Sequence, residues 1–139
     1  MMTEQEIFEK LRPLVRQVTG APEEGIHMDS NLMRDLGAAS LDLLDMSFLI
    51  EEAFGITLTG REFEQHVAQR LAGGAYEENG FLTEAALAEL RQLMPEVPPE
   101  KLQPPLPKAA LSEVLNVAVF VHLIERKLAE AAESVEARG

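Results

Sequence analysis

The sequence predicts an all-α protein, a small bundle of helices around a shared core. Apolar residues recur at spacings of three and four in several separate stretches, and capping or helix-breaking residues bound these stretches. Nothing in the chain alternates convincingly enough to predict a strand. A chain of 139 residues is long enough to bury a core of its own. We therefore expect one domain, residues 1–139.

The first helix has clear start and stop signals. Thr3 and Glu6 form a T-x-x-E capping box, in which each side chain satisfies a free N–H at the helix start. Pro13 removes an internal hydrogen bond, so we expect it to kink or divide the helix. Gly20, followed by Pro22, ends it. The apolar stripe of this helix consists of Ile7, Leu11, Leu14, Val15 and Val18.

A long loop is expected over residues 21–37. Ile26, Leu32 and Leu36 are its apolar positions, and we expect them to hold the loop against the core. The sequence Asp29-Ser30-Asn31 offers short polar side chains that can cap a local turn.

The second helix is predicted to begin at Ser40 and to end near Phe54, with Gly55 as its C-terminal cap. Asp42, Asp45 and Glu52 fall on one stripe with Leu49, which we expect to be exposed. The predicted core face consists of Leu41, Leu44 and Phe48, widened by Leu43 and Ile50.

Beyond Thr59 the pattern changes. A moderate helix is predicted over residues 61–71, ended by Ala72-Gly73-Gly74. Thr83 should cap a further helix that runs to about Met94. Its apolar face consists of Leu87, Leu90 and Leu93 or Met94.

Prolines between residues 95 and 107 predict an extended, stiff connector. The most apolar helix follows over residues 109–132, and residues 133–139 are expected to fray. The inward residues of that helix are Leu111, Val114, Leu115, Ala118, Val121 and Ile124.

The charge of the chain excludes several classes of partner. The formal net charge is −12, so nucleic acid and anionic membranes repel the surface, whereas basic protein patches attract it. Between residues 23 and 52 the only basic residue is Arg34. The acidic excess therefore concentrates around the second helix.

Other chemistry is also excluded. The chain has no cysteine, so disulfides, thiolate metal sites and a cysteine nucleophile are ruled out. His27, His66 and His122 are too scattered for a metal site, and we expect His122 to be a satisfied buried or edge histidine. Met28, Met33 and Met46 either fill irregular parts of the core or line an internal cavity. The acidic start and the lack of a long apolar run predict a cytoplasmic protein without a membrane span.

Ser40 stands just after the glycine at position 37 and at the start of the acidic helix. It is either an ordinary N-cap or an attachment point for a phosphodiester, because a helix start favours a negative group. Gly37, Ala38 and Ala39 are small and leave the hydroxyl accessible. A serine hydrolase is disfavoured, since the chain has no G-x-S-x-G elbow and no strand before the serine.

The run from Asp35 to Ile56, D-L-G-A-A-S-L-D followed by a helix ending in F-G-I, resembles the modification site of acyl carrier proteins. The likeness extends from Gly20 to about Leu58. It implies a four-helix carrier fold and a 4′-phosphopantetheine arm attached to Ser40, with Gly37, Ala39 and Leu41 around the attachment. The thiol of the arm would supply the sulfur that the chain lacks.

The resemblance also implies partners and the absence of catalysis. A phosphopantetheinyl transferase would add the arm, and acyl-loading, elongating and acyl-transferring enzymes with basic patches would dock. The helix after the serine is the docking surface in this family, which gives Asp42, Asp45, Leu49 and Glu52 a recognition role. Such charges mainly speed the association with a partner and determine which partners bind. The carrier itself would be a monomer with no catalytic residue and no metal.

Two features depart from the family pattern. Ala39 replaces the aspartate that normally precedes the serine, which narrows the set of suitable transferases. Residues 60–107 form an insertion between a carrier-like part, residues 1–59, and the final core helix, residues 108–132. The insertion could enlarge an acyl pocket, provide a surface for particular partners, or be neutral. An aminoacyl or peptidyl carrier and an unmodified interaction protein with the same fold remain alternatives.

Overall fold

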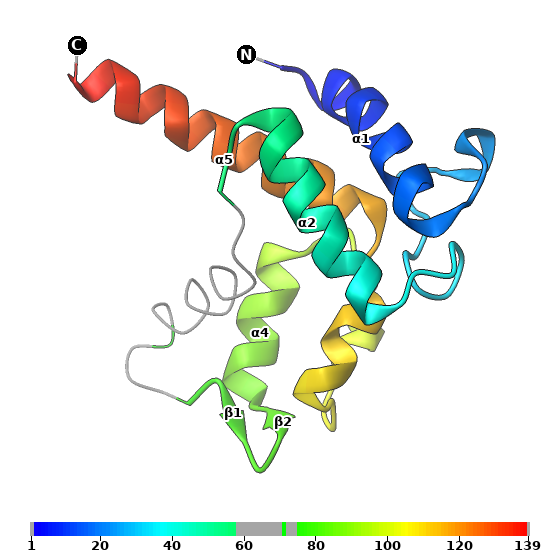
Figure 1. Ribbon diagram of the computed structural model, residues 1–139. Coiled ribbons are helices and arrows are strands. Elements are labelled where there is room, and N and C mark those ends of the chain that lie inside the picture. The colour runs from blue at the N-terminus through cyan, green and yellow to red at the C-terminus, as the bar shows by residue number, and fades with distance from the viewer. Residues whose placement is uncertain (1, 58–70, 72–74, 139) are drawn as a thin grey trace.

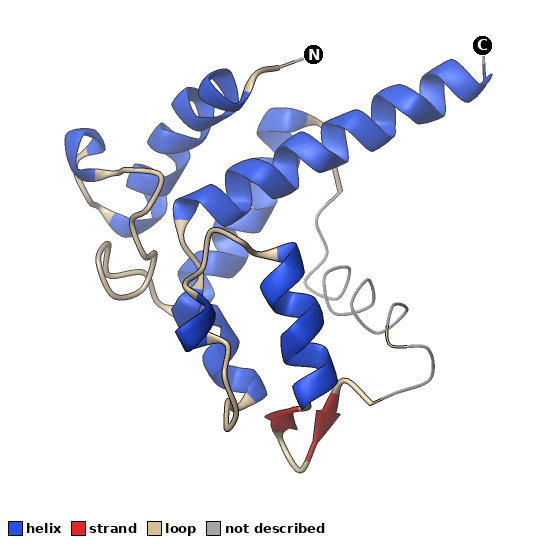
Figure 2. Ribbon diagram, turned by 180° about the vertical axis from the view of Figure 1, so that it is seen from behind, coloured by secondary structure: helices blue, strands red, loops and turns tan. Residues whose placement is uncertain are grey.

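The computed structural model describes residues 2–57, 71 and 75–138, and within them the protein is mostly helical. Figures 1 and 2 show α1, α2 and α5 grouped together, with α4 and a small hairpin at one end of this group. The predicted helix over residues 61–71 and its break at 72–74 lie outside the described residues, apart from residue 71. The α-helices are α1 (Glu4–Thr19), α2 (Ser40–Phe54), α4 (Glu84–Leu93) and α5 (Val117–Arg138).

Short elements connect these helices. Three single-turn or two-turn 3-10 helices are η1 (Glu23–Gly25), η2 (Pro99–Lys101) and η3 (Lys108–Val114). The strands β1 (Glu77–Glu78) and β2 (Phe81–Leu82) pair antiparallel. No helix among the described residues is long and apolar enough to cross a membrane.

The capping box of α1 is confirmed. The Thr3 N–H donates to Glu6 Oε1 at 2.9 Å, and the Glu6 N–H donates to Thr3 Oγ1 at 3.1 Å. At the other end Gly20 adopts a left-handed conformation with φ of 77°, and its N–H donates to the Arg16 carbonyl. Pro13 lies inside one continuous helix, so α1 is not divided there.

The main core lies between α1, α2, the loop over residues 21–37 and α5. As predicted, Ile26, Leu32 and Leu36 are buried and fix the loop against this core. The buried side chains from the helices are Ile7, Phe8, Leu11 and Val15 of α1, Met46, Ile50 and Phe54 of α2, and Val117, Phe120, Val121 and Ile124 of α5.

The predicted core face of α2 is wrong. Leu41, Leu44 and Phe48 are 73%, 52% and 59% exposed, whereas Met46 and Ile50 are buried. Of the predicted set, only Ile50 is buried, while Leu43 is half-buried against the core. Because α2 carries apolar residues on nearly every side, helical spacing fits two different faces, and packing against α1 selects the one that is buried.

The inserted part of the chain builds a second core cluster on α5. Thr83 caps α4 as predicted, since its Oγ1 accepts from the Ala86 N–H at 3.1 Å. Val119 of α5 belongs to this second cluster, whereas Val117, Phe120 and Val121 of α5 belong to the main core. The buried members of the second cluster are Leu82, Ala86, Leu87, Leu90, Met94, Val97, Leu102 and Val119.

The hairpin β1–β2 was missed by the prediction of an all-α chain. Glu77 pairs with Leu82 and Glu78 with Phe81, around a turn at Asn79 and Gly80. Both turn residues have positive φ, 54° and 84°, as a two-residue type I′ turn requires. The Asn79-Gly80 dipeptide is the sequence signal for this hairpin. Each strand has only two residues, so no alternation of apolar and polar residues accompanies that signal.

The proline-rich segment is not an extended connector. Within it, η2 is closed by hydrogen bonds from the Lys101 and Leu102 N–H groups to the Pro98 and Pro99 carbonyls, both at 3.0 Å. The side chains of Val97 and Leu102 are buried in the second cluster. The segment therefore packs against the protein.

The last helix begins and ends later than predicted. Residues 108–114 form η3, and α5 starts at Val117. Asn116 caps α5, since its Oδ1 accepts from the Val119 N–H at 3.1 Å. The helix continues to Arg138, so the backbone is helical through most of the expected frayed tail, and its far end extends past the bundle (Figures 1 and 2).

Candidate functional site

Ser40 is the first residue of α2, and the N-cap is Ala39. Ala39 has extended backbone angles, with φ of −94° and ψ of 169°, but it has no side-chain acceptor for a helix N–H. The interpretation of Ser40 as an ordinary N-cap is therefore wrong by one residue. The first backbone N–H groups of a helix have no acceptor within the helix and carry partial positive charge. At the start of α2 no N-cap side chain accepts from these groups.

Asp42 partly compensates for the missing cap. The Ala39 N–H donates to Asp42 Oδ2 at 2.8 Å, which is the returning half of a capping box. The Ala39 carbonyl in turn accepts from the Asp42 and Leu43 N–H groups at 3.0 and 3.2 Å. Asp42, predicted as a docking residue, thus has a local structural role at the first turn of α2.

The approach to Ser40 is a tightly bonded turn. Gly37 has φ of 76°, a left-handed conformation that favours glycine, and its N–H donates to the Met33 carbonyl at 3.2 Å. The Ala38 N–H donates to the Leu32 carbonyl at 2.9 Å, and Ala38 is buried. Gly37 and Ala39 are exposed, so the buried Ala38 anchors the turn between two accessible positions.

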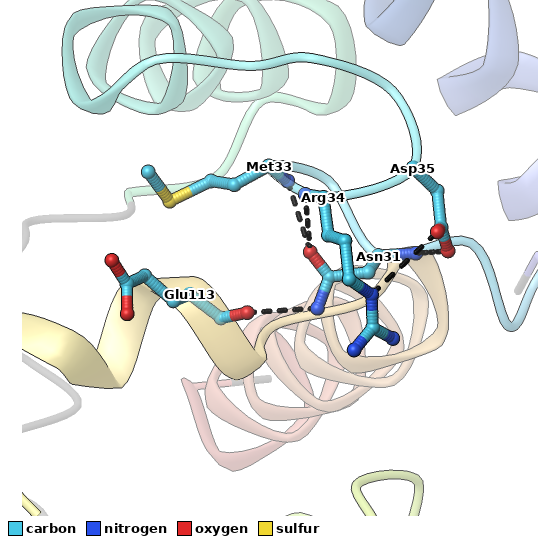
Figure 3. A network of polar contacts seen from close by, with 5 residues as sticks. All are labelled: Asn31, Met33, Arg34, Asp35 and Glu113. Carbon is cyan, nitrogen blue, oxygen red and sulfur yellow. Dashed lines mark hydrogen bonds and ion pairs between the residues drawn. The ribbon is translucent and has the colours of Figure 1, made fainter.

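Asn31 is the centre of the polar network in this loop (Figure 3). Its Oδ1 accepts from the Met33 and Arg34 N–H groups at 3.1 and 2.8 Å. Its Nδ2 donates to the Glu113 carbonyl at 2.8 Å, and its own N–H donates to Asp35 Oδ2 at 2.8 Å. The sequence predicted local capping here, but it gave no sign of the contact with Glu113, which is distant in the chain.

The loop also pairs through its backbone with the segment that leads into α5. The Leu32 N–H donates to the Leu115 carbonyl at 3.1 Å. In the opposite direction, the Val117 N–H donates to the Ser30 carbonyl at 3.0 Å. A further bond runs from the Ala118 N–H to the Met28 carbonyl at 2.8 Å. The start of α5 therefore holds the loop that precedes Ser40.

The exposed face of α2 carries both apolar and acidic side chains. Leu41, Leu44 and Phe48 form an exposed stripe at helical spacing, directly after Ser40. Asp45 and Glu52 are exposed as expected. We call these five residues the α2 face.

Leu49, which was expected to be exposed on the acidic stripe, is half-buried. Leu44 and Phe48 had been assigned to the core, so the sequence analysis missed them as surface residues.

The remaining histidine and methionine predictions have clear outcomes. Among the described residues, no group of three or more histidine, cysteine, aspartate or glutamate side chains could hold a metal ion. His27 is exposed, His66 lies outside the described residues, and His122 is a half-buried edge histidine with carboxylate partners. The buried Met46 fills the core, and Met28 and Met33 pack partly buried against it.

The comparisons with known proteins point to one family. Residues 9–73 match the family model for a phosphopantetheine attachment site. Over 64 residues, 46% of the chain, the sequence is 41% identical to an acyl carrier protein of Guillardia theta and covers 79% of that relative. The chain belongs to the acyl carrier protein family.

Other members of the family are also similar. An acyl carrier protein of Petrotoga mobilis is 33% identical over 64 residues, 46% of the chain and 75% of that relative. One of Cyanidium caldarium is 35% identical over 65 residues, 47% of the chain and 76% of that relative. No solved structure matches significantly. As a member of this family the protein is a carrier, and its cofactor is covalently attached 4′-phosphopantetheine.

The start of α2 fits such a group. A phosphodiester needs a hydroxyl for attachment and a positive environment for its charge, and Ser40 begins a helix of 15 residues. Because the N-cap is an alanine, no cap side chain accepts the free N–H groups at this end. The carboxylate of Asp42 bonds to the Ala39 N–H, so it is held by the turn before the serine.

Proposed function

We propose that Ser40 carries the 4′-phosphopantetheine arm and that the protein holds acyl intermediates as thioesters in fatty-acid, specialised lipid or polyketide-type synthesis. The observation that supports this most directly is the position of Ser40. It is the first residue of α2, it lies within the region that matches the family, and it follows the left-handed turn at Gly37.

The residues around Ser40 suit this role. When bound, the arm supplies a terminal thiol, which this cysteine-free chain cannot provide. The N-terminus of α2 stabilises the phosphodiester charge, an effect worth about 0.3–1 kcal/mol at an exposed site. The exposed, small residues Gly37 and Ala39 leave room for a modifying enzyme beside the serine.

The α2 face supports docking of partner enzymes. Leu41, Leu44 and Phe48 offer exposed apolar area on this face, and the exposed carboxylates of Asp45 and Glu52 attract a basic partner. We propose that the phosphopantetheinyl transferase and the acyl-loading, elongating and acyl-transferring enzymes use this face. Asp42 contributes through the first turn of α2, and Leu49 contributes through its exposed part.

The remaining expectations stay predictions. We propose that the chain is a monomeric, cytoplasmic carrier that catalyses nothing and is a substrate of its partners. We divide it into a carrier-like part, residues 1–59, an inserted segment, residues 60–107, and a final helical part that packs on α1. An aminoacyl or peptidyl cargo is the alternative within the family, and loading assays with activated acyl and aminoacyl groups would distinguish the two.

Modification of Ser40 is directly testable. Incubation of the apo protein with coenzyme A and a broad-specificity phosphopantetheinyl transferase should raise the intact mass by one phosphopantetheine group. The variant Ser40→Ala should show no gain, because it lacks the hydroxyl that forms the phosphodiester. Intact-mass spectrometry and peptide mapping measure both results.

Ser47 provides the matched control. It also lies on α2, but its hydroxyl donates to the Leu43 carbonyl inside the helix, so Ser47→Ala should be modified like the parent. If no transferase modifies the parent protein, the chain is an unmodified interaction protein that keeps the carrier fold. A mass gain in Ser40→Ala would place the attachment elsewhere.

A further inference from the structure

We propose that Asn31 is a positioning residue through which η3 and the second core cluster hold the loop ahead of Ser40 in the form that the transferase modifies. The inference rests on the proposed attachment at Ser40. It adds that η3, which packs against the second core cluster, acts on the modification site through one buried carboxamide (Figure 3).

Both polar atoms of the Asn31 carboxamide form hydrogen bonds. The residue is 3% exposed, so an unpaired polar atom here would be costly. Its oxygen accepts two main-chain N–H groups inside the loop, from Met33 and Arg34. Its nitrogen donates outside the loop, to the Glu113 carbonyl at 2.8 Å. One side chain thus closes the turn and ties it to another element.

The element that Asn31 contacts, η3, packs against the second core cluster. Glu113 lies in η3, which joins the proline-rich segment to α5. Leu111 and Val114, also in η3, pack against the second core cluster. Any displacement of that cluster relative to α5 therefore moves the carbonyl to which Asn31 donates.

On the loop side, the residues that Asn31 holds lie close to Ser40 in the chain. The residues that Asn31 holds, Met33 and Arg34, precede the left-handed turn at Gly37. The Gly37 N–H donates back to the Met33 carbonyl, at 3.2 Å. Ala39, the N-cap of α2, is two residues further on. Because Ala39 gives α2 no side-chain cap, the conformation of this turn sets the position of the serine.

Replacement of Asn31 by aspartate separates the two functions of the carboxamide. Aspartate keeps the acceptor for the Met33 and Arg34 N–H groups but lacks the donor for the Glu113 carbonyl. Asn31→Asp should therefore leave the turn closed and release it from η3. Asn116→Asp is a matched control for the loss of a buried carboxamide donor. The Asn116 carboxamide donates to the Glu96 carbonyl at 3.0 Å and accepts from the Val119 N–H, and both partners lie outside the loop over residues 21–37.

The test compares the two variants with the parent in modification by the transferase with coenzyme A. For Asn31→Asp we expect kcat to fall about tenfold, corresponding to about 1.4 kcal/mol, with KM for the carrier unchanged because the α2 face is intact. For Asn116→Asp both constants should stay near the parent values. Amide hydrogen exchange at Leu32 and Ala38 should be faster in Asn31→Asp alone.

Each outcome decides the proposal. Unchanged kinetics in Asn31→Asp would overturn the proposal. An equal loss of kcat in Asn31→Asp and Asn116→Asp would also overturn it, because the loss would then come from lower general stability. If the parent is not modified at all, the attachment at Ser40 fails instead, and the exchange rates at Leu32 and Ala38 still decide whether Asn31 ties the loop to η3. Should Asn31→Asp not fold, Asn31→Ser takes its place, because the shorter serine side chain adds no charge and its hydroxyl does not extend as far towards the Glu113 carbonyl as the amide nitrogen of Asn31.

Discussion

His122 joins three parts of the chain through its two ring nitrogens. Its Nδ1 pairs with Glu96 of the inserted segment, and its Nε2 lies 3.4 Å from Glu4 Oε1 at the start of α1. Partial burial alone would lower the pKa of His122, but the hydrogen bonds and charges of Glu96 and Glu4 outweigh it, so its pKa is raised above the ordinary value of 6.5. The protonated ring therefore stabilises the fold.

The raised pKa predicts how stability depends on pH. A group with a higher pKa in the folded state stabilises fully below its unfolded pKa, and this stabilisation is lost as pH rises through the folded pKa. Urea unfolding should thus give a lower free energy of unfolding at about pH 9 than at about pH 6, which brackets the ordinary histidine value. His122→Asn should flatten this dependence.

The exposed His27 supplies the control for this experiment. His27→Asn should not flatten the pH dependence of the free energy of unfolding, because it leaves the contacts of His122 with Glu96 and Glu4 intact. If the free energy of unfolding of His122→Asn still depends steeply on pH, groups other than His122 and its partners Glu96 and Glu4 dominate the pH dependence.

At the scale of the element, α2 has two apolar faces with different functions. One face, with Met46, Ile50 and Phe54, packs in the main core. The other, with Leu44 and Phe48, faces outward. Exposed large apolar residues grouped on one helix mark an interaction surface more often than scattered ones do. The apolar excess of α2 thus divides between a core face and an exposed face, for which we propose docking.

A pair of variants separates the two faces. Ile50→Ala removes buried methyl and methylene groups and should lower the free energy of unfolding by about 2–5 kcal/mol. Phe48→Ala changes an exposed site and should stay within about 0.5 kcal/mol of the parent. In the transferase assay Phe48→Ala should raise KM for the carrier, because the docking face loses apolar area. Urea unfolding and steady-state kinetics measure these effects.

The contrast between the variants is what tests the assignment. Comparable destabilisation by Phe48→Ala and Ile50→Ala would mean that Phe48 is buried in solution. A stable Phe48→Ala variant with unchanged KM would remove Phe48 from the docking surface of the transferase.

At the scale of the whole molecule, α5 lies between two core clusters. Val121 and Ile124 belong to the main cluster, while Val119 belongs to the second. Leu115, just before α5, packs against both. Because one helix supplies both clusters, neither can lose α5 without exposing apolar surface in the other. We therefore expect the two clusters to unfold together.

Tyr76 makes this expectation measurable. It is the only tyrosine, the chain has no tryptophan, and it packs against the second cluster. Its fluorescence reports that cluster alone, whereas far-UV circular dichroism reports all helices. The two urea transitions should coincide, as for a single cooperative unit. An earlier transition in the tyrosine signal would show that the inserted segment unfolds independently of the carrier core.

Local signals in the sequence were sufficient for the ends of several helices. Thr3 with Glu6, Gly20, Gly55 and Thr83 act on N–H and carbonyl groups a few residues away, so their effect does not depend on the rest of the fold. The same holds for the turn before Ser40, where Gly37 takes a positive φ. These signals placed the candidate attachment site at the start of α2.

Features that depend on distant residues were missed or misplaced. The inward face of α2 is chosen by packing on α1, and helical spacing alone fitted the wrong one. The start of α5 at Val117 depends on Asn116, whose amide donates to the Glu96 carbonyl. The contact of Asn31 with Glu113 links residues 82 positions apart, which no local pattern reveals.

The sequence by itself determined the helical class, the capped ends, the acidic surface and the serine at the head of α2, because each follows from residue type and short spacing. Only the tertiary structure decided which side of α2 is buried, how the inserted segment builds a second cluster on α5, and how Asn31 ties that architecture to the loop before Ser40. The physical reason is that burial and long-range hydrogen bonds are properties of neighbours in space. For this carrier, those neighbours are α1 and the segments from the opposite end of the chain.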